Sequence, residues 1–412
     1  MEVVVVGSSA AALSAIEHFR RYDLHSRVTL ITRDRGLPYS RVLLPYVLRG
    51  SVPYENLTIR EEGYFEGLKL RQVYGEICAL EREKRQVRLK DGARFPYDRL
   101  LIASGARASV PDIPGIDHDR VCYMRTREDL DHMLPLLKGN PRVAVIGSGF
   151  VALQAAWAAR YRGLDVTILG HRIMPAAIDE AGGEQVARAI EDCGVRLLAP
   201  VDTRRIEHLP DGSLRLWWSE RDFVDADVVL AGAGTRPNVE WLAGSGIQVE
   251  KGIPVNEKMQ TSDPLIYAAG DAAAGPTVFG EAHVIHSLWP TAVEMGKVAG
   301  CQMAGVDMPY PGSLNMNVTQ MFRVTVASVG KIRNRDVDAG YALPEELGYG
   351  HCRVFVKDGR LCGASLVGSS EGVPFLGRLR PLIARREPLA CPVEELGRLV
   401  NKKVFSKTSD GM

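Results

Sequence analysis

The 412-residue sequence lacks several features that would assign it to a class of protein at once. Its charges nearly cancel, with 51 basic and 50 acidic residues, so no bulk field favours nucleic acid as a partner. No hydrophobic run approaches the roughly 20 residues that a membrane-spanning helix needs. A strand-like run begins at Glu2, which leaves no room for a signal peptide. We therefore expect a cytoplasmic protein with no nucleic-acid or membrane partner.

Cysteine is sparse and has no pattern. There are seven cysteines, none in a Cys-x-x-Cys pair or at a spacing typical of a metal site, and an odd number argues against a disulfide framework. We expect ordinary buried or half-buried thiols and no metal. Cys352 and Cys362 flank a turn at Lys357-Asp358-Gly359, so they could lie near each other across two strands. Proximity alone would not make them redox active.

Two glycine-rich turns are the most informative feature that is present. Each follows a β-branched or aliphatic run, Val3–Val6 and Val143–Ile146, and each opens an apolar helical pattern. A buried parallel strand is typically a continuous run of such apolar residues. Small residues after the strand let a diphosphate approach the amides of a helix N-terminus. Two such turns predict two bound dinucleotides, which in one chain indicates hydride transfer between them. A flavin and a nicotinamide are the pair we expect.

The wider pattern predicts an α/β fold with two doubly wound, Rossmann-like dinucleotide-binding domains and a C-terminal α+β domain. Proline-rich stretches mark the crossings between domains. We expect a split FAD-binding domain (1–111 and 236–309), an NAD(P)-binding domain (112–235) and a C-terminal interface domain (310–412). The main elements predicted are strands at 3–6, 28–31, 100–103, 143–146, 166–169 and 228–230, helices at about 11–22, up to 161, 184–193 and 291–303, ribbons at 87–90 and 214–218, and a hairpin at 353–356 and 361–366.

Several motifs together resemble those of FAD- and NAD(P)-dependent pyridine nucleotide oxidoreductases. They are the segments 101–106, 232–238, and 261–262 running on to 267–271. The last is similar to the family's second flavin motif, whose aspartate accepts a hydrogen bond from a ribityl hydroxyl, and this role falls on Asp271. Asp34 ends the second strand, where it is either a ribose ligand or a solvated loop carboxylate. The cofactor contacts implied are Gly7, Ser9, Ala10, Ala12, Asp34, Arg41, Ile77, Ser104, Gly105, Gly270 and Asp271 for FAD, and Gly147, Gly149, Phe150, Val151, His171, Arg172 and Gly234 for NAD(P).

The segment 37–46 separates branches of this family. Aligning Leu44-Pro45-Tyr46 with the branch that uses a redox-active cysteine places Val42 at the cysteine position, and valine excludes that thiol chemistry. Pro38-Tyr39-Ser40-Arg41 instead resembles rubredoxin and ferredoxin reductases and the flavin module of assimilatory nitrite reductase. The segment 282–299 resembles the same group, in which Trp289 would lie by the flavin just before a helix. Otherwise Trp289 is a core aromatic.

The chain departs from the family pattern at two places. Tyr46 and Gln154 replace a lysine and a glutamate that can form an ion pair beside the flavin, and their joint neutrality avoids a lone buried charge. Gly170 replaces the carboxylate that binds the adenosine ribose of NADH, and Arg172 follows where it could pair with a 2′-phosphate. We expect NADPH to be preferred. The alternative is that Arg172 points to solvent and NADH is still accepted.

The resemblance implies an NAD(P)H-dependent FAD flavoprotein reductase. The flavin does the chemistry, and Trp289, Gln154 and Tyr46 flank it. Electrons would then pass to a small iron–sulfur acceptor of the rubredoxin or ferredoxin type, with the reductase a monomer or homodimer. Two alternatives stay open: an oxidase or quinone or small-molecule reductase without a protein acceptor, and a diaphorase subunit of a larger redox complex.

Overall fold

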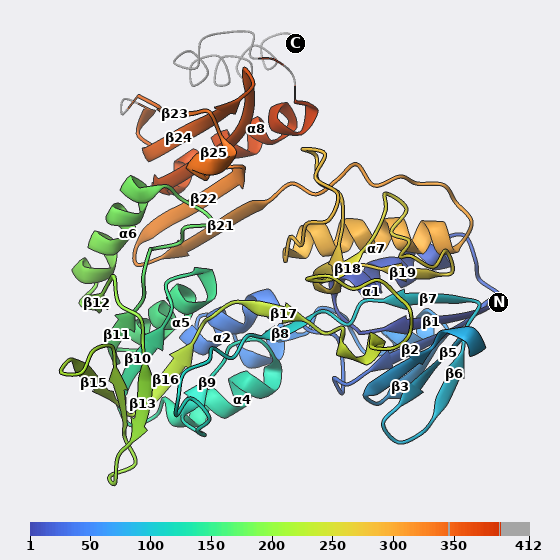
Figure 1. Ribbon diagram of the computed structural model, residues 1–412, viewed down its shortest axis with the longest axis horizontal. Coiled ribbons are helices and arrows are strands. Elements are labelled where there is room, and N and C mark those ends of the chain that lie inside the picture. The colour runs from blue at the N-terminus through green and yellow to red at the C-terminus, as the bar shows by residue number, and fades with distance from the viewer. Residues whose placement is uncertain (345–346, 387, 389–412) are drawn as a thin grey trace. The chain divides into compact units, whose positions relative to one another are not determined.

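The computed structural model describes residues 1–344, 347–386 and 388. The chain forms two compact units, drawn in Figure 1. The first unit is made of Met1–Leu43, Pro53–Arg107 and Thr235–Leu314. The second is made of Leu44–Val52, Ala108–Gly234 and the chain from Asn315 onward. Among the described residues, no helix is both long enough and apolar enough to cross a lipid bilayer.

A five-stranded parallel sheet forms the centre of the first unit. Its strand order is β19-β7-β1-β2-β3, so the order reverses beside β1. The valine run of β1 is almost completely buried, as expected for a central parallel strand covered on both faces. The elements are β1 (Glu2–Val6), α1 (Ala10–Arg20), β2 (Arg27–Thr32), β3 (Leu70–Tyr74), β7 (Arg99–Ile102), β19 (Ile266–Ala268) and α7 (Trp289–Met303).

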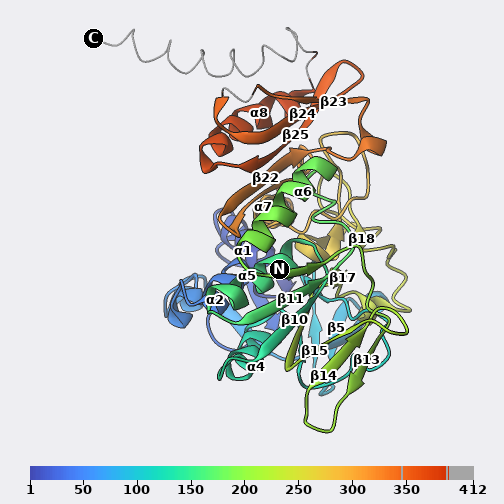
Figure 2. The ribbon, with the colours of Figure 1, turned by 90° about the vertical axis from the view of Figure 1, so that its left-hand side faces the viewer.

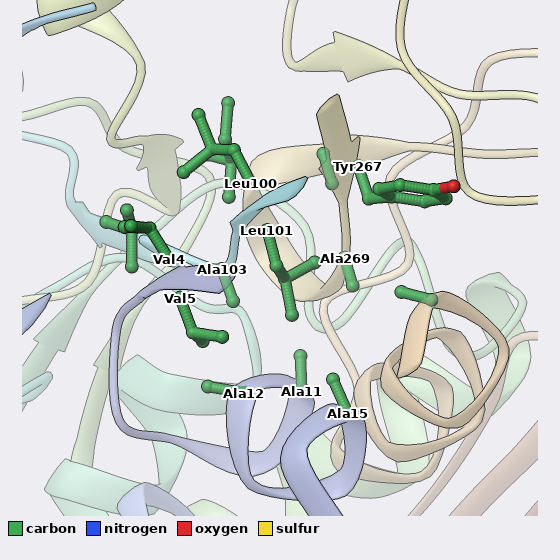
Figure 3. Close-up of a cluster of buried hydrophobic side chains, with 14 of the residues drawn as sticks. Val4, Val5, Ala11, Ala12, Ala15, Leu100, Leu101, Ala103, Tyr267 and Ala269 are labelled. Carbon is green, nitrogen blue, oxygen red and sulfur yellow. The ribbon is translucent and has the colours of Figure 1, made fainter. Parts of the chain in front are cut away.

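Helices α1 and α7 pack together unusually closely. A Cβ atom at Gly296 would lie 2.2 Å from the carbonyl oxygen of Ala11, and one at Gly300 would lie 2.1 Å from that of Ala15. Figure 3 shows the small side chains of Ala11, Ala12 and Ala15 in the same buried cluster as the sheet residues. Glycine on one helix and alanine on the other therefore set the spacing of this layer.

Smaller elements complete the first unit. The ribbon predicted at 87–90 is the middle strand of a three-stranded antiparallel sheet. The remaining elements are α3 (Tyr64–Gly67), β4 (Ile77–Glu81), β5 (Gln86–Leu89), β6 (Arg94–Pro96), β18 (Ile253–Pro254), β20 (Ala273–Ala274), and β8 (Ala106–Ala108) paired with β17 (Thr235–Pro237).

The second unit repeats the same strand plan. Its parallel sheet has the order β12-β11-β10-β16-β9, with the reversal beside β10. A three-stranded ribbon, β13-β14-β15, adjoins this sheet. The elements are α2 (Leu44–Arg49), β9 (Val121–Cys122), α4 (Arg127–Leu136), β10 (Arg142–Ile146), α5 (Phe150–Tyr161), β11 (Asp165–Leu169), α6 (Glu180–Asp192), β12 (Arg196–Leu198), β13 (Arg205–His208), β14 (Leu214–Trp217), β15 (Phe223–Ala226) and β16 (Val228–Ala231).

The second unit also contains an antiparallel sheet built from the end of the chain. Its order is β21-β22-β25-β24-β23, and α8 (Val373–Arg385) covers one face with Phe375, Leu376, Leu379 and Ile383. Helix α6 lies between this sheet and the parallel sheet, which Figure 2 shows. The strands are β21 (Met316–Met321), β22 (Val324–Gly330), β23 (Ala339–Ala342), β24 (Gly350–Lys357) and β25 (Arg360–Gly368).

Two local predictions were wrong. Helix α6 begins at Glu180 rather than near 184, because Asp179 caps it and outweighs the poor helix propensity of the two glycines that follow. Cys352 and Cys362 are not cross-strand neighbours. Cys352 lies opposite Leu366, while the Cys362 thiol donates to the Phe355 carbonyl at 3.3 Å, and a bulge after Phe355 shifts the register between them.

Candidate cofactor sites

The two glycine turns have the same geometry. Gly7 and Gly147 have φ values of +100° and +109°, which only glycine adopts without strain. A Cβ at Gly7 would lie 2.2 Å from the Ala103 carbonyl oxygen, and one at Gly147 would lie 2.6 Å from that of Gly232. Each glycine therefore packs against the neighbouring strand end, β7 or β16, at the point where the strand order reverses. Dinucleotides bind in α/β folds at this point.

The helix that follows each turn has an N-terminus with no side-chain cap. Ser9 and Gly149 are the N-cap residues of α1 and α5, and neither helix has a side-chain cap hydrogen bond or an acidic residue in its first turn. By contrast, Thr126 and Asp179 cap α4 and α6 with their side chains. The first amides of α1 and α5 thus lack the usual acceptor, and a phosphate group can supply it. Both turns fit a dinucleotide diphosphate.

Asp271 lies beside the start of α1 in the first unit. A Cβ at Gly270 would lie 3.1 Å from the Cβ of Ala11 in α1 and 3.7 Å from that of Ala292 in α7. The Gly-Asp motif is therefore held where the first turns of both helices meet. Trp289 is the first residue of α7, rather than preceding it, and is partly buried against the core. This arrangement brings the predicted second flavin motif to the Gly7 turn.

Asp34 and Arg41, two of the predicted FAD contacts, form an ion pair. Arg41 Nη2 donates to Asp34 Oδ2 at 2.7 Å, with side chains 23% and 16% exposed. The guanidinium also lies over the Tyr39 ring at 5.0 Å. The Asp34 carboxylate is therefore not freely solvated. The sequence alone does not indicate that these two residues meet. A carboxylate so paired still has lone pairs for a ribose hydroxyl, so that contact remains a prediction.

The remaining predicted FAD residues lie on the same unit. Asn238 is hydrogen-bonded to Ser104, in the segment that follows β7. The Ser104 hydroxyl donates to the Asn238 carbonyl at 2.8 Å, and Asn238 Nδ2 donates to the Ser104 carbonyl at 2.9 Å. Gly105 has a φ of +66°. Ile77 is half-buried in β4 and packs against the core. Asn238 is the last residue of the motif 232–238, and the sequence alone assigns it no role.

In the second unit the predicted NAD(P) residues surround the start of α5. Val151 is 42% exposed in the first turn, and Phe150 is half-buried. Gly234 has a φ of +89° with open space where a Cβ would be. His171 and Arg172 are exposed on the segment that leaves β11. Among the described residues, neither side chain has a hydrogen-bond or ion-pair partner, so both are available to a ligand.

Tyr46 and Gln154, which replace the lysine and glutamate of the family pattern, contact Arg49 and Thr319 respectively. Arg49 places its guanidinium 5.1 Å from the centroid of the Tyr46 ring and 5.3 Å from that of Tyr161. Gln154 Nε2 donates to Thr319 Oγ1 of β21 at 3.0 Å. Helices α2 and α5, which carry the two residues, pack together. Their position beside a flavin remains a prediction.

Three buried cysteines are disfavoured as thiolates. Burial raises the pKa of Cys122 and Cys352 to about 12 and that of Cys362 to about 11. Val42, at the position of the family's redox cysteine, is 53% exposed. Cys391 lies outside the described residues. The described part of the chain also contains no group of three or more His, Cys, Asp or Glu residues arranged to hold a metal.

Comparisons with known proteins agree with this geometry. Residues 1–296 match the family described as pyridine nucleotide-disulphide oxidoreductase. The NADH-dependent phenylglyoxylate dehydrogenase subunit epsilon of Aromatoleum evansii is 31% identical over 394 residues, covering 94% of this chain and 92% of that one. Rhodocoxin reductase of Rhodococcus erythropolis is 30% identical over 315 residues, covering 75% and 74%. The covalent putidaredoxin reductase–putidaredoxin complex has the same fold, with a TM-score of 0.88, 23% identity and 99% coverage of both chains.

Proposed function

The chain belongs to the pyridine nucleotide-disulphide oxidoreductase family and is an FAD-dependent NAD(P)H oxidoreductase, and we propose that it delivers electrons to a small iron–sulfur acceptor protein. The observation that carries the proposal is the pair of matched glycine turns with uncapped helices, together with the valine at the sequence position of a redox cysteine. A bound flavin supplies the chemistry, because it accepts a hydride and can release electrons one at a time.

Val42, at the position of the redox cysteine, supports the direct transfer of electrons from the flavin to an acceptor. In the cysteine-using branch, the redox-active cysteine takes part in the chemistry beside the flavin. Here Val42 cannot do so, and burial keeps the described thiols with raised pKa protonated at neutral pH. Two relatives that each match about three quarters of this chain are named for a ferredoxin and a rubredoxin as the partner of the reductase. One-electron delivery to an iron–sulfur protein fits both points.

A second candidate function involves the same electron-transfer chemistry but places the chain in a larger complex. The relative from Aromatoleum evansii is named as one subunit of a dehydrogenase, and this chain covers 92% of it. The proposed alternative is therefore a diaphorase subunit that exchanges electrons with iron–sulfur partners inside a stable complex. Purification from the native host under mild conditions separates the two: co-elution with other subunits supports the complex, and elution as a monomer or homodimer supports the free reductase.

An acceptor panel tests the main proposal. The FAD-loaded chain is reduced with NADPH or NADH, flavin bleaching is followed by stopped flow, and electrons are then offered to rubredoxin, a [2Fe–2S] ferredoxin, oxygen and a quinone. We expect an iron–sulfur protein to be reduced with a kcat/KM at least about tenfold above that for oxygen or quinone, a barrier difference of roughly 1.4 kcal/mol. Equal or faster turnover with oxygen or quinone would overturn the proposal and favour an oxidase or small-molecule reductase.

A further inference from the structure

The segment that leaves β11 is tied to the second glycine turn by a single residue, Ser148. The Ser148 hydroxyl donates to the Arg172 carbonyl at 2.7 Å. The Ser148 carbonyl accepts the backbone N–H of Met174 at 2.9 Å. Two bonds from one residue therefore fix positions 172 and 174, and the fixed segment carries the exposed Arg172 side chain.

This segment is held in a strained conformation. Met174 has a φ of +42°, a left-handed value that is rare for a residue with a long side chain, and it is 1% exposed. A non-glycine residue keeps such a conformation only where its surroundings over-determine it. The bond to Ser148 and the burial of the Met174 side chain supply that constraint.

Gly170 is what allows Ser148 to come so close. A Cβ at Gly170 would lie 2.8 Å from both the Cβ and the Oγ of Ser148. Gly170 cannot move away easily, because its N–H donates to Leu198 at 3.1 Å and its carbonyl accepts the N–H of Val201 at 2.8 Å. The residue that lacks the expected carboxylate is thus also the residue that makes room for the serine.

We infer that Ser148 is a positioning residue for cofactor selection: it holds the 170–174 segment so that Arg172 meets the 2′-phosphate of NADPH at the end of β11. The inference rests on the proposed function, since it concerns the same nicotinamide site. Ser148 acts through Arg172 and has no direct part in hydride transfer. Its hydroxyl is engaged by the Arg172 carbonyl, so the selection comes from where the guanidinium is held.

Binding of cofactor fragments to the FAD-loaded full chain tests the inference by calorimetry. Adenosine 2′,5′-bisphosphate is compared with 5′-AMP in the unmodified protein, S148A, R172A and the double variant. R172A should weaken the bisphosphate about tenfold to a hundredfold, the range for a charge-assisted hydrogen bond, and leave 5′-AMP within about twofold. S148A should weaken the bisphosphate alone by about threefold to tenfold. The double variant should lose no more than R172A, because the serine acts through the arginine.

Gly170→Ala provides an independent variant that keeps the serine. Its added Cβ must displace Ser148, so it should weaken the bisphosphate selectively, as S148A does. Ser213→Ala is the matched control, because Ser213 is equally buried in the same unit but donates to Asp211 at 2.6 Å, on the ribbon. It should change neither affinity. In steady-state assays the KM for NADPH should rise in S148A while kcat stays within about twofold.

Equal weakening of both fragments in S148A, or additive losses in the double variant, would overturn the inference. Flavin bleaching by NADH distinguishes failure of this inference from failure of the proposed function. If the unmodified protein binds the bisphosphate no more tightly than 5′-AMP but NADH still reduces the flavin and an iron–sulfur acceptor, selection by Ser148 fails and the proposed function stands. If the bisphosphate is selected but no iron–sulfur protein is reduced, the reverse holds.

Discussion

Arg353 of β24 donates from Nη1 to the Oδ2 atom of Asp179, 2.6 Å away and 174 residues earlier in the chain. The same carboxylate caps α6 by accepting the N–H of Gly182, and it accepts His351 Nε2 at 2.9 Å. Burial alone would raise the pKa of Asp179, but the hydrogen bonds from His351 and Arg353 outweigh it and hold the pKa below its ordinary value. One carboxylate therefore joins α6 to the antiparallel sheet within the second unit.

Asp179→Ala should destabilise the second unit. The variant loses a helix cap and a charge-assisted hydrogen bond, together on the order of 2–3 kcal/mol. Because the folded-state pKa is lowered, this contribution is fully present above the ordinary pKa of 3.8 and is lost as the pH falls through the folded-state value. Urea unfolding at pH 7 and well below pH 3.8 measures the difference in stability between variant and unmodified protein, which should shrink at the lower pH. An unchanged urea midpoint at pH 7 would contradict the prediction.

Gly7→Ala should prevent FAD binding. The new methyl group would meet the Ala103 carbonyl at 2.2 Å, and alanine disfavours a φ of +100°. The turn must therefore move away from the position that a diphosphate needs. The measurement is flavin absorbance that stays with the protein through gel filtration. The control is Gly377→Ala in α8, which meets no atom within 4 Å and should stabilise the helix by about 0.5–1 kcal/mol with full flavin content. Full flavin content in the Gly7 variant would refute this role for the turn.

Asp271→Ala should lose FAD while the second unit stays folded. Asp271 follows Gly270, which packs against the first turns of α1 and α7, and loss of a charge-assisted hydrogen bond weakens binding about tenfold to a hundredfold. Fluorescence titration of the apoprotein with FAD measures this, and Asp271→Asn should retain more affinity because it keeps one acceptor oxygen. Asp91→Ala, in an exposed turn of the first unit, is the control. Binding of 2′,5′-bisphosphate at unchanged affinity would show that the second unit remains intact.

Replacing all seven cysteines by alanine should leave flavin reduction within about tenfold, a barrier change near 1.4 kcal/mol. The unmodified protein should pass directly to fully reduced flavin on two-electron reduction, without the long-wavelength band of a thiolate beside oxidised flavin. The reason is that Val42 replaces the redox cysteine and burial disfavours the thiolates of Cys122, Cys352 and Cys362. Stopped-flow spectra provide both readouts. A single cysteine whose replacement abolishes reduction, with FAD still bound, would place the chain in the other branch.

Much of the fold could be predicted because its signals are local. The runs Val3–Val6 and Val143–Ile146 are strands in the centres of two parallel sheets, and Gly7 and Gly147 have the positive φ that their position in the turn requires. The start of α6 could not be predicted from helix propensity, because Gly182 and Gly183 are poor helix formers. The Asp179 side chain, which caps the helix, stabilises this first turn.

The sequence by itself determined the two glycine turns that follow β1 and β10, and it placed a valine at position 42, because strand runs, left-handed glycines and the identity of a single side chain depend on adjacent residues alone. Only the tertiary structure decided which side chains meet. It paired Arg41 with Asp34, brought Arg353 to Asp179, and placed Ser148 against Gly170. Asp34 and Arg41 are only seven residues apart, and they meet because the chain folds back after β2. The other two contacts join segments that are further apart in the sequence, and no spacing along the chain encodes their closeness.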